Sequence, residues 1–454
     1  MRLGDKLTRF MALAPCAEAT PEPPASTGAE PLSASTGPEP SAESEPAMSV
    51  VSTLRARIEA MRSAAERRGE PRVSTRHDRR ASALDPTLER RILASEVPQR
   101  LEDALPGRAI ETSRGPVWVA ETRHAPADLH GDRRLGDALR GSYEHLRRVT
   151  GDARLDGFDP RRALYLDIEA TGLEHGAGTL AFMIGLGFFE GDSVCVQQLI
   201  VREPDEEGAL LELLWEAIHR WPYLVSFNGK SFDLSVLQSR LVMHRFCSAR
   251  EGELKLRPHL DLLHLSRAVY RGLWDDVRLQ TLERRVLGFE RHDDMPGALA
   301  PTCFFAWLRN GDAGPLGGIG RHNRWDVLSM VGLAGHLADD ALPQPDPGRR
   351  ARIVLNLASL YLRRREPRDA LSVLDGLPSL MTPVEREEAL TLEATASRRV
   401  GDHERLARAL AELAERRPED LTIASALARA LRRAHPTARL TTRPAVRRAG
   451  ARAL

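Results

Sequence analysis

The sequence predicts an α/β fold, in which a mixed sheet is flanked by helices and an all-α region of helical repeats follows. Apolar runs with strand periodicity fill 163–171 and 180–201. A turn at Glu190-Gly191-Asp192 divides the second run, so the first three strands form hairpins in the order 1-2-3. From about Arg349 the spacing of apolar residues becomes purely helical, which predicts the second region.

Helices and strands alternate after the third strand. The segment 206–220 has apolar residues at helical spacing, and its first turn is acidic, where the helix dipole favours negative charge. A buried strand at 223–228 and a helix at 231–244 follow. We then expect a short strand running into a helix at 258–270 and a long helix at 324–342. This alternation is typical of a mixed sheet covered by helices.

Composition divides the rest of the chain. Residues 1–50 are rich in Pro, Ser, Ala and Glu and cannot bury enough apolar surface to become ordered, so we expect a disordered tail. Residues 51–150 form an accessory region of helices and short strands, including a strand from Gly115 to Thr122. The α/β domain spans 155–342 and the helical repeats span 349–436. Residues 437–454 form a basic tail.

Two segments of the repeat region, Leu357 to Leu377 and Leu392 to Pro418, align with a period of roughly 35 residues. This period suits a tetratricopeptide helix pair, in which Ala370 and Leu406 would occupy the helix-packing position. The expected tryptophan and small residues are largely missing. Tetratricopeptide-like stacking is therefore the prediction, a generic helical bundle is its alternative, and the repeats could dock a protein partner.

Composition and charge exclude several classes of protein. A hydrophobic content of 42% supports a sizeable core, and a net charge of +1 gives no overall footprint for nucleic acid, so any basic groove is local. The 4 cysteines contain no CxxC pair, which argues against a zinc cluster and suits a reducing cytoplasm. No apolar run approaches the roughly 18 residues of a membrane span. We expect a cytoplasmic protein without membrane association.

Two carboxylates lie in the first predicted strand, within LYLDIEATGLE. Residues i and i+2 of a strand point to the same face, so Asp167 and Glu169 project together. Oxygen ligands of this kind suit Mg²⁺ or Mn²⁺, and two-metal hydrolysis of phosphodiesters needs several converging carboxylates. Thr171 and Gly172 suit a turn where substrate could approach. The alternative is a solvent-facing strand with two incidental acids.

A second acid follows the strand at 223–228. Asp233 would lie in the first turn of a helix, a position where acids are common because of the helix dipole alone. Asn228 and Gly229 would make the turn before it. Lys230 could contact a phosphate, and Phe232 either anchors the helix on the sheet or stacks on a base.

The third segment is RHNRWDVLSM, in which His322 and Asp326 lie four residues apart on one helix face. A histidine beside a metal carboxylate is a natural general base for activating water. A surface His–Asp pair is the alternative. The order of the three segments along the chain makes a chance occurrence improbable, although each segment alone is a weak signal.

These three segments resemble the motifs of the DEDD 3′–5′ exonucleases, within the ribonuclease H-like superfamily. The region from Asp156 to Leu342 looks most like the bacterial YprB-like ribonuclease H-like proteins, including PHLDLLHLSR and RLQTLERRVLGFERHDDMPG. The resemblance implies a ribonuclease H-like sheet that binds two ions of Mg²⁺ or Mn²⁺. It implies four metal ligands and His322 as the base, the ligands being Asp167, Glu169, Asp233 and Asp326.

One spacing departs from the family pattern. The histidine branch usually has four residues between the histidine and the last aspartate, whereas this chain has the three-residue spacing of the tyrosine branch. Asp261 sits where family members often have an acid, and we interpret it as a residue that positions substrate or supports the ligands. Asp293 and Asp294 would form a loop near the cleft or simply be surface acids.

The leading hypothesis is a metal-dependent nuclease that acts on DNA or RNA, and more narrowly a 3′–5′ exonuclease. The alternative is a non-catalytic nucleic-acid-binding or scaffold protein that uses its helical repeats. A third hypothesis is a ribonuclease H that cleaves RNA–DNA hybrids internally. Product lengths separate the first from the third, and metal binding separates the first from the second.

Overall fold

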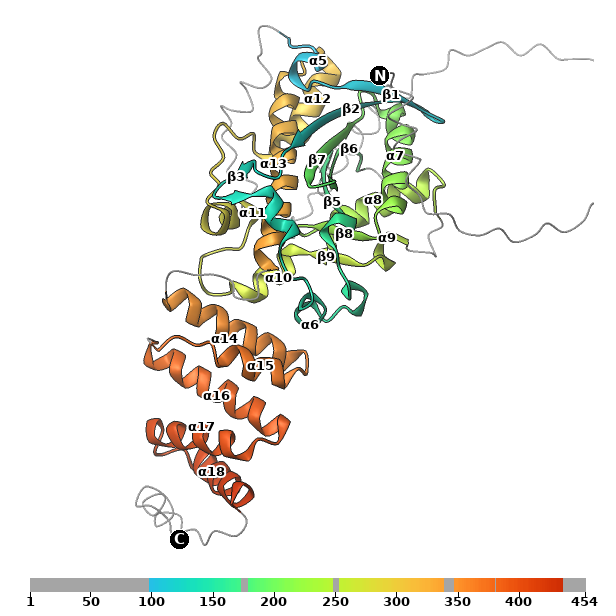
Figure 1. Ribbon diagram of the computed structural model, residues 1–454. Helices are drawn as coiled ribbons and strands as arrows, with labels where there is room; N and C mark the ends of the chain where they lie inside the picture. The colour runs from blue at the N-terminus through green and yellow to red at the C-terminus, as the bar shows by residue number, and fades with distance from the viewer. Residues whose placement is uncertain (1–97, 173–178, 248–252, 339–346, 380, 436–454) are drawn as a thin grey trace, which may run out of the picture. The chain divides into compact units, whose positions relative to one another are not determined.

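A computed structural model of the chain describes residues 98–172, 179–247, 253–338, 347–379 and 381–435 (Figure 1). Three expectations fall wholly or partly on other residues. The disordered tail at 1–50 and the basic tail at 437–454 lie outside the described residues, as does the first half of the accessory region.

The centre of the molecule is a seven-stranded sheet with the strand order β1-β2-β7-β6-β5-β8-β9. β5, β6 and β7 pair antiparallel with one another, whereas β5 and β8 pair in parallel, as do β8 and β9. The predicted mixed sheet and its opening hairpins are therefore confirmed. These five strands are β5 (Ala163–Ala170), β6 (Ala181–Glu190), β7 (Ser193–Ile200), β8 (Tyr223–Ser226) and β9 (His259–Asp261).

The accessory region adds two strands to the same sheet. β2 (Gly115–His124) contains the predicted strand and pairs antiparallel with β7, and β1 (Arg108–Thr112) pairs with β2. A small hairpin of β3 (Leu129–His130) and β4 (Arg133–Arg134) follows. The sheet is thus wider than the predicted 155–342 domain. The remaining short elements here are α5 (Leu101–Ala104), η1 (Leu135–Leu139), α6 (Leu146–Thr150), η2 (Ala153–Leu155) and η3 (Pro160–Arg162).

Helices cover both faces of the sheet (Figure 1). α13 (Gly314–Leu337), a helix of 24 residues, packs across β5, β6 and β7 on one face. α7 (Glu207–Arg220) packs against β1 and β2 from the other side. The remaining helical elements of this part are η4 (Pro204–Glu206), α8 (Asp233–Met243), α9 (Glu253–Leu256), α10 (Leu262–Val269), α11 (Leu279–Leu282), η5 (Glu283–Leu287), η6 (Gly297–Leu299) and α12 (Ala300–Asn310).

Strand alternation decides which residues of β5 meet α13. Tyr165 is fully buried and belongs to the same apolar cluster as Val327 and Val331 of α13. Asp167 and Glu169 lie two and four residues further along, so they share this face. The acids therefore enter the layer between sheet and helix, where an ordinary strand would continue the apolar core.

The C-terminal part is entirely helical in its described residues, as predicted. Corresponding helices begin 36 residues apart, at Pro347 and Pro383 and again at Pro367 and His403. Ala370 and Leu406 are buried. The assignment to tetratricopeptide repeats stays a prediction. The helices are α14 (Pro347–Arg363), α15 (Pro367–Leu374), α16 (Pro383–Val400), α17 (His403–Arg416) and α18 (Leu421–Ala434).

Among the described residues, no helix combines the length and apolar character that crossing a membrane requires.

Candidate active site

The first two acids lie at the carboxyl end of β5. Asp167 is opposite Gly185 of β6 and Glu169 is opposite Met183, and the register then shifts at Ala170. Such a β-bulge bends a strand and increases its local twist, and bulges are frequent beside active sites. Asp167 is partly buried and Glu169 is buried. β5 therefore ends with both carboxylates beneath α13, on one face of the strand as the alternation predicted.

Thr171 connects the end of β5 to the start of β6. Its backbone N–H donates to the Leu180 carbonyl at 2.9 Å, and its hydroxyl accepts from the Leu180 N–H at 3.0 Å. Gly172 follows and is partly buried. The two residues therefore fix the mouth of the β5–β6 connection, and their contact with substrate stays a prediction.

Asp233 begins α8, the helix predicted after a strand, and its side chain is buried. The loop before it places Asn228 in the left-handed region, at φ 72°, which asparagine tolerates better than most residues. A Cβ on Gly229 would lie 2.3 Å from the Ser226 hydroxyl oxygen and 3.1 Å from Oδ2 of Asp233. Only glycine therefore lets this loop pass so close to the Asp233 carboxylate.

Asp261 fixes the backbone of the same loop. It is 4% exposed and ends β9. Its carboxylate accepts the N–H groups of Asn228 at 3.0 Å and Lys230 at 3.1 Å, and that of Leu263 at 3.1 Å. This agrees with a supporting position for Asp261. The side chain of Lys230 is exposed and that of Phe232 is half-buried, so their predicted substrate contacts stay predictions.

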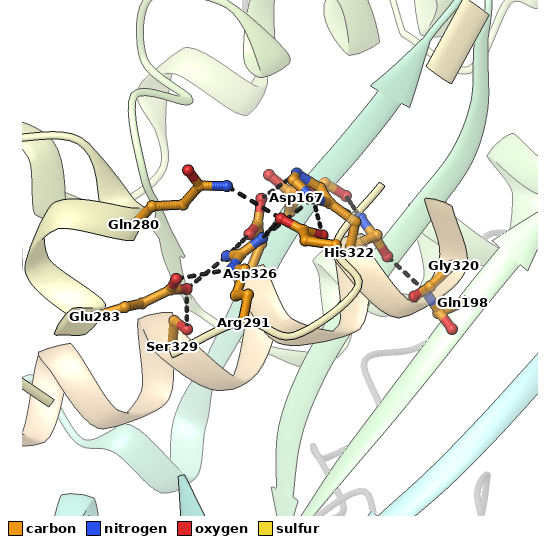
Figure 2. A network of polar contacts seen from close by, with 11 residues as sticks. Asp167, Gln198, Gln280, Glu283, Arg291, Gly320, His322, Asp326 and Ser329 are labelled. Carbon is orange, nitrogen blue, oxygen red and sulfur yellow. Dashed lines mark hydrogen bonds and ion pairs between the residues drawn. The ribbon is translucent and has the colours of Figure 1, made fainter. Parts of the chain in front are cut away.

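α13 brings His322 and Asp326 to the acids from the opposite layer (Figure 2). His322 Nε2 lies 3.6 Å from Oδ2 of Asp326. Its Nδ1 lies 2.8 Å from Oδ1 of Asp294 and 3.1 Å from Nη1 of Arg291. One ring nitrogen cannot donate to Asp294 and accept from Arg291 at the same time. The shorter contact with the carboxylate favours an Nδ1–H that donates to Asp294.

Arg291 is the buried cation of this network. Its guanidinium binds Oδ1 of Asp326, and it also donates to Glu283 from Nε at 2.7 Å and from Nη2 at 2.5 Å. The Ser329 hydroxyl donates to the same glutamate at 2.5 Å. The side chains of Arg291 and Glu283 are 6% and 1% exposed. Neither residue was expected from the sequence, because the partners come from separate elements.

Burial and mutual repulsion dominate the electrostatics of the acids. Burial, followed by the charges of Asp326, Asp233 and Glu169, holds the pKa of Asp167 well above its usual range. Burial is also the main cause that raises the pKa of Glu169 and that of Asp233, each to about 8. A neutral carboxyl group escapes the cost of an unpaired buried charge.

His322 responds in the opposite sense. Burial opposes its charged form, but the charges of Asp326 and Glu169 and the hydrogen bond with Asp294 outweigh burial and raise its pKa to about 9. The imidazolium therefore adds a second positive charge to the cluster of acids, beside that of Arg291.

The acids match a divalent cation in their chemistry. Carboxylate oxygens are the preferred ligands of Mg²⁺ and Mn²⁺, and repulsion between these acids adds to the effect of burial on the pKa values of Asp167, Glu169 and Asp233. Their oxygens do not converge on a common centre. Within the described part of the chain, no three His, Cys, Asp or Glu side chains are arranged to hold an ion. One oxygen of Asp326 is engaged by Arg291 instead.

Two buried amides complete the site. Asn323 of α13 donates from Nδ2 to Oδ2 of Asp167 at 2.8 Å, and its Oδ1 accepts from Nε2 of Gln198 at 2.9 Å. Gln198 also donates to the Gly320 carbonyl at 2.6 Å. Both side chains are essentially inaccessible, at 0% and 2% exposure. Neither amide was predicted from the sequence, although Gly185 inside a strand was a signal for a close approach at this point.

Comparison with known proteins identifies the class of the α/β part. Residues 164–338 match the RNase_H superfamily, so this segment is a ribonuclease H superfamily domain. Membership supports a nuclease-type domain that acts on nucleic acid. The matched segment contains all of the predicted metal ligands.

A curated protein of Bacillus subtilis (strain 168), named "Uncharacterized protein YprB", is similar to the chain. The two are 30% identical over 221 residues, which is 49% of this chain and 52% of the relative. The chain thus matches about half the length of that relative. The similarity agrees with the family resemblance found in the motifs, and no activity is stated in the relative's name.

Proposed function

We propose that the protein is a divalent-metal-dependent 3′–5′ exonuclease of the DEDD type. The cluster of four carboxylates carries this proposal, because ionised acids that are crowded together are costly and bound cations would offset that cost. Asp167, Glu169, Asp233 and Asp326 would hold Mg²⁺ or Mn²⁺, with two ions expected. Bound ions of this kind activate water and stabilise the leaving oxygen.

With divalent cations bound to the carboxylates, the charges that raise the pKa of His322 would be offset, and the neutral imidazole would accept the proton of the attacking water at Nε2. Its Nδ1–H is held by Asp294, which fixes the ring and leaves Nε2 on the side of Asp326. The water oxygen bonds to phosphorus while the bond from phosphorus to the 3′ oxygen of the preceding nucleotide breaks. That oxygen takes a proton from solvent and remains on the shortened strand as its 3′ hydroxyl, and a nucleoside 5′-monophosphate is released. The unusual spacing of three residues keeps His322 and Asp326 on one helix face.

The test uses the full chain with labelled single-stranded DNA, duplex DNA and RNA, in Mg²⁺ and in Mn²⁺. We expect mononucleotide release, and we expect Asp167→Ala to lower it by more than about 100-fold, since changes behind metal ligands alone cost about 10–100-fold. Asp312→Ala is the matched control. Asp312 is a buried aspartate whose carboxylate accepts the backbone N–H groups of Gln99 and Gly314, at 3.0 Å each. Full activity of the D167A protein would contradict the assignment.

The ion pair between Arg291 and Asp326 favours a second candidate function. In it, protein cations hold the carboxylates and the domain binds nucleic acid without cleaving it. A Mn²⁺ titration followed by melting temperature separates the two. A metal site predicts stabilisation that the D167A/E169A protein loses, whereas the binding function predicts no metal effect in either protein.

A further inference from the structure

Three residues on neighbouring strands lie in one row across the sheet. Asp167 of β5 is opposite Gly185 of β6, and Gly185 is opposite Gln198 of β7. All three face α13, because directly opposed residues of a sheet share a face. The middle position has no side chain, so the row contains a gap between a carboxylate and an amide.

The side chain of Asn323 fills that gap from above. A Cβ on Gly185 would lie 2.3 Å from Oδ1 of Asn323 and 2.9 Å from its Nδ2, so any larger residue would displace the amide. From this place Asn323 reaches Gln198 with one end and Asp167 with the other. The glycine is thus what allows a helix residue to bridge two strands that are not neighbours.

The direction of the bridge is fixed by a backbone carbonyl. The Gly320 carbonyl can only accept, so the atom of Gln198 that faces it must be the nitrogen Nε2. The same nitrogen donates to Asn323, which must therefore present its oxygen there and its nitrogen to Asp167. Asp167 consequently receives a donor at Oδ2, and one carboxylate oxygen is pinned in place.

We propose that Asn323 is the positioning residue of Asp167, with Gln198 fixing its amide and Gly185 providing its space. The proposal rests on the proposed function, in which Asp167 holds a divalent cation. With Oδ2 held by the amide, Asp167 presents its other oxygen in one orientation. The entropy cost of ordering the Asp167 side chain is then incurred when the protein folds and not when the ion binds. Partners behind a metal ligand orient it in this way.

The first test is Asn323→Leu, which keeps the shape and removes the donor without adding charge. We expect about 10–100-fold more Mn²⁺ to be needed for half-maximal thermal stabilisation, the usual effect of losing such a partner. Asn356→Leu is the matched control. Asn356 is also a buried helical asparagine, and it donates to the Val269 and Arg271 carbonyls at 2.9 Å each. Loss of the Asn356 amide should lower the free energy of unfolding and leave the Mn²⁺ requirement unchanged.

The second test uses two glycines of β6 that face the same helix. Gly185→Ala should displace Asn323 and reproduce the higher Mn²⁺ requirement. In Gly187→Ala the new Cβ would lie 2.4 Å from Cγ1 of Val327, a comparable clash that involves packing alone. Both proteins should be less stable, and only G185A should need more metal. Equal Mn²⁺ requirements in G185A and G187A would overturn the proposal.

Gln198→Met tests whether the hydrogen-bonded series Gln198–Asn323–Asp167 acts as a unit. If Gln198 works through Asn323, the Q198M/N323L protein needs no more Mn²⁺ than N323L alone, whereas independent effects would add. The failure of this inference can be distinguished from the failure of the proposed function. A parent protein that Mn²⁺ does not stabilise overturns both this inference and the metal-dependent function. A stabilised parent with an unchanged requirement in N323L overturns this inference alone.

Discussion

The acids of the candidate site depend on partners that lie far from them in the sequence. Arg291 reaches Asp326 across 35 positions, and Asn323 reaches Asp167 across 156. Each partner is an ordinary residue in its own segment, one in a loop and one in a helix. Periodicity relates residues of one element only, so it indicated the carboxylates and could not indicate what holds them.

Single residues differ in how far the sequence could place them. Strand alternation was sufficient to predict that Asp167 and Glu169 share one face of a strand. Helical spacing was sufficient to predict that His322 and Asp326 share one face of a helix. Asp294 was considered as a loop or surface acid, and its hydrogen bond to His322 was not foreseen. That contact depends on the path of the chain after η5, which no local pattern fixes.

His130 makes stability depend on pH. It is 4% exposed and contacts the Ser329 hydroxyl at 2.7 Å. Burial, followed by the charges of Arg291 and His124, lowers its pKa from 6.5 to about 3. Below pH 6.5 the unfolded chain therefore binds a proton that the folded protein does not bind. The stabilisation is complete above pH 6.5 and is lost as the pH falls towards 3.

We expect His130→Gln, which stays neutral, to remove this part of the acid sensitivity. The free energy of unfolding of the parent should fall faster between pH 6.5 and 5, by up to about 1.4 kcal/mol per pH unit. Denaturant unfolding at several pH values measures the difference. His259, whose pKa burial lowers to about 4, acts in the same sense and is present in both proteins. Parallel pH profiles for the two proteins would contradict the prediction.

At the scale of elements, α13 carries the site residues His322 and Asp326 and also contains glycines that let other segments pack closely against it. A Cβ on Gly317 would lie 2.7 Å from the Ala104 carbonyl oxygen of α5, and one on Gly335 would lie 2.8 Å from Cα of Ala138 in η1. The accessory region thus contacts the helix that carries His322 and Asp326. Glycine weakens a helix interior, so close packing offsets its cost here.

Two glycines of α13 should respond oppositely to the same change. At Gly332 a Cβ would lie 3.5 Å from both Leu287 methyl groups, an ordinary contact, so Gly332→Ala should stabilise by up to about 1 kcal/mol through helix propensity. Gly335→Ala places its Cβ against the backbone of η1 and should destabilise by about 1–3 kcal/mol. Denaturant unfolding measures both. If both variants changed the free energy of unfolding in the same direction, packing would not be what decides their effect.

The accessory strands show that a sequence pattern can predict a strand without predicting its partner. The strand at Gly115 to Thr122 was predicted, but its partner was not, because β2 pairs with β7, whose paired residues lie 70 to 82 positions later. A strand periodicity says which face is apolar and does not say which strand lies beside it. In the C-terminal part, the helical character was predicted from apolar spacing, because consecutive helices pack on one another and the pattern is local.

At the scale of the whole molecule, the buried apolar residues form separate clusters. One cluster joins residues of the α/β part, such as Tyr165 and Val331, to residues of α14, α15 and α16, among them Leu360. Another lies within α16, α17 and α18 and includes Leu410. The first helices of the C-terminal part therefore share a core with the ribonuclease H superfamily domain, whereas the last two do not.

Two leucine truncations test this division. Leu360 and Leu410 are 5% and 7% exposed, and replacing a buried leucine by alanine typically costs about 2–5 kcal/mol. In the full chain, we expect Leu360→Ala to speed amide hydrogen exchange in α13 and α14 together, because both contribute to its cluster. Leu410→Ala should speed exchange in α17 and α18 and leave α13 unchanged. Faster exchange of α13 in L410A would mean that the two clusters unfold as one cooperative unit.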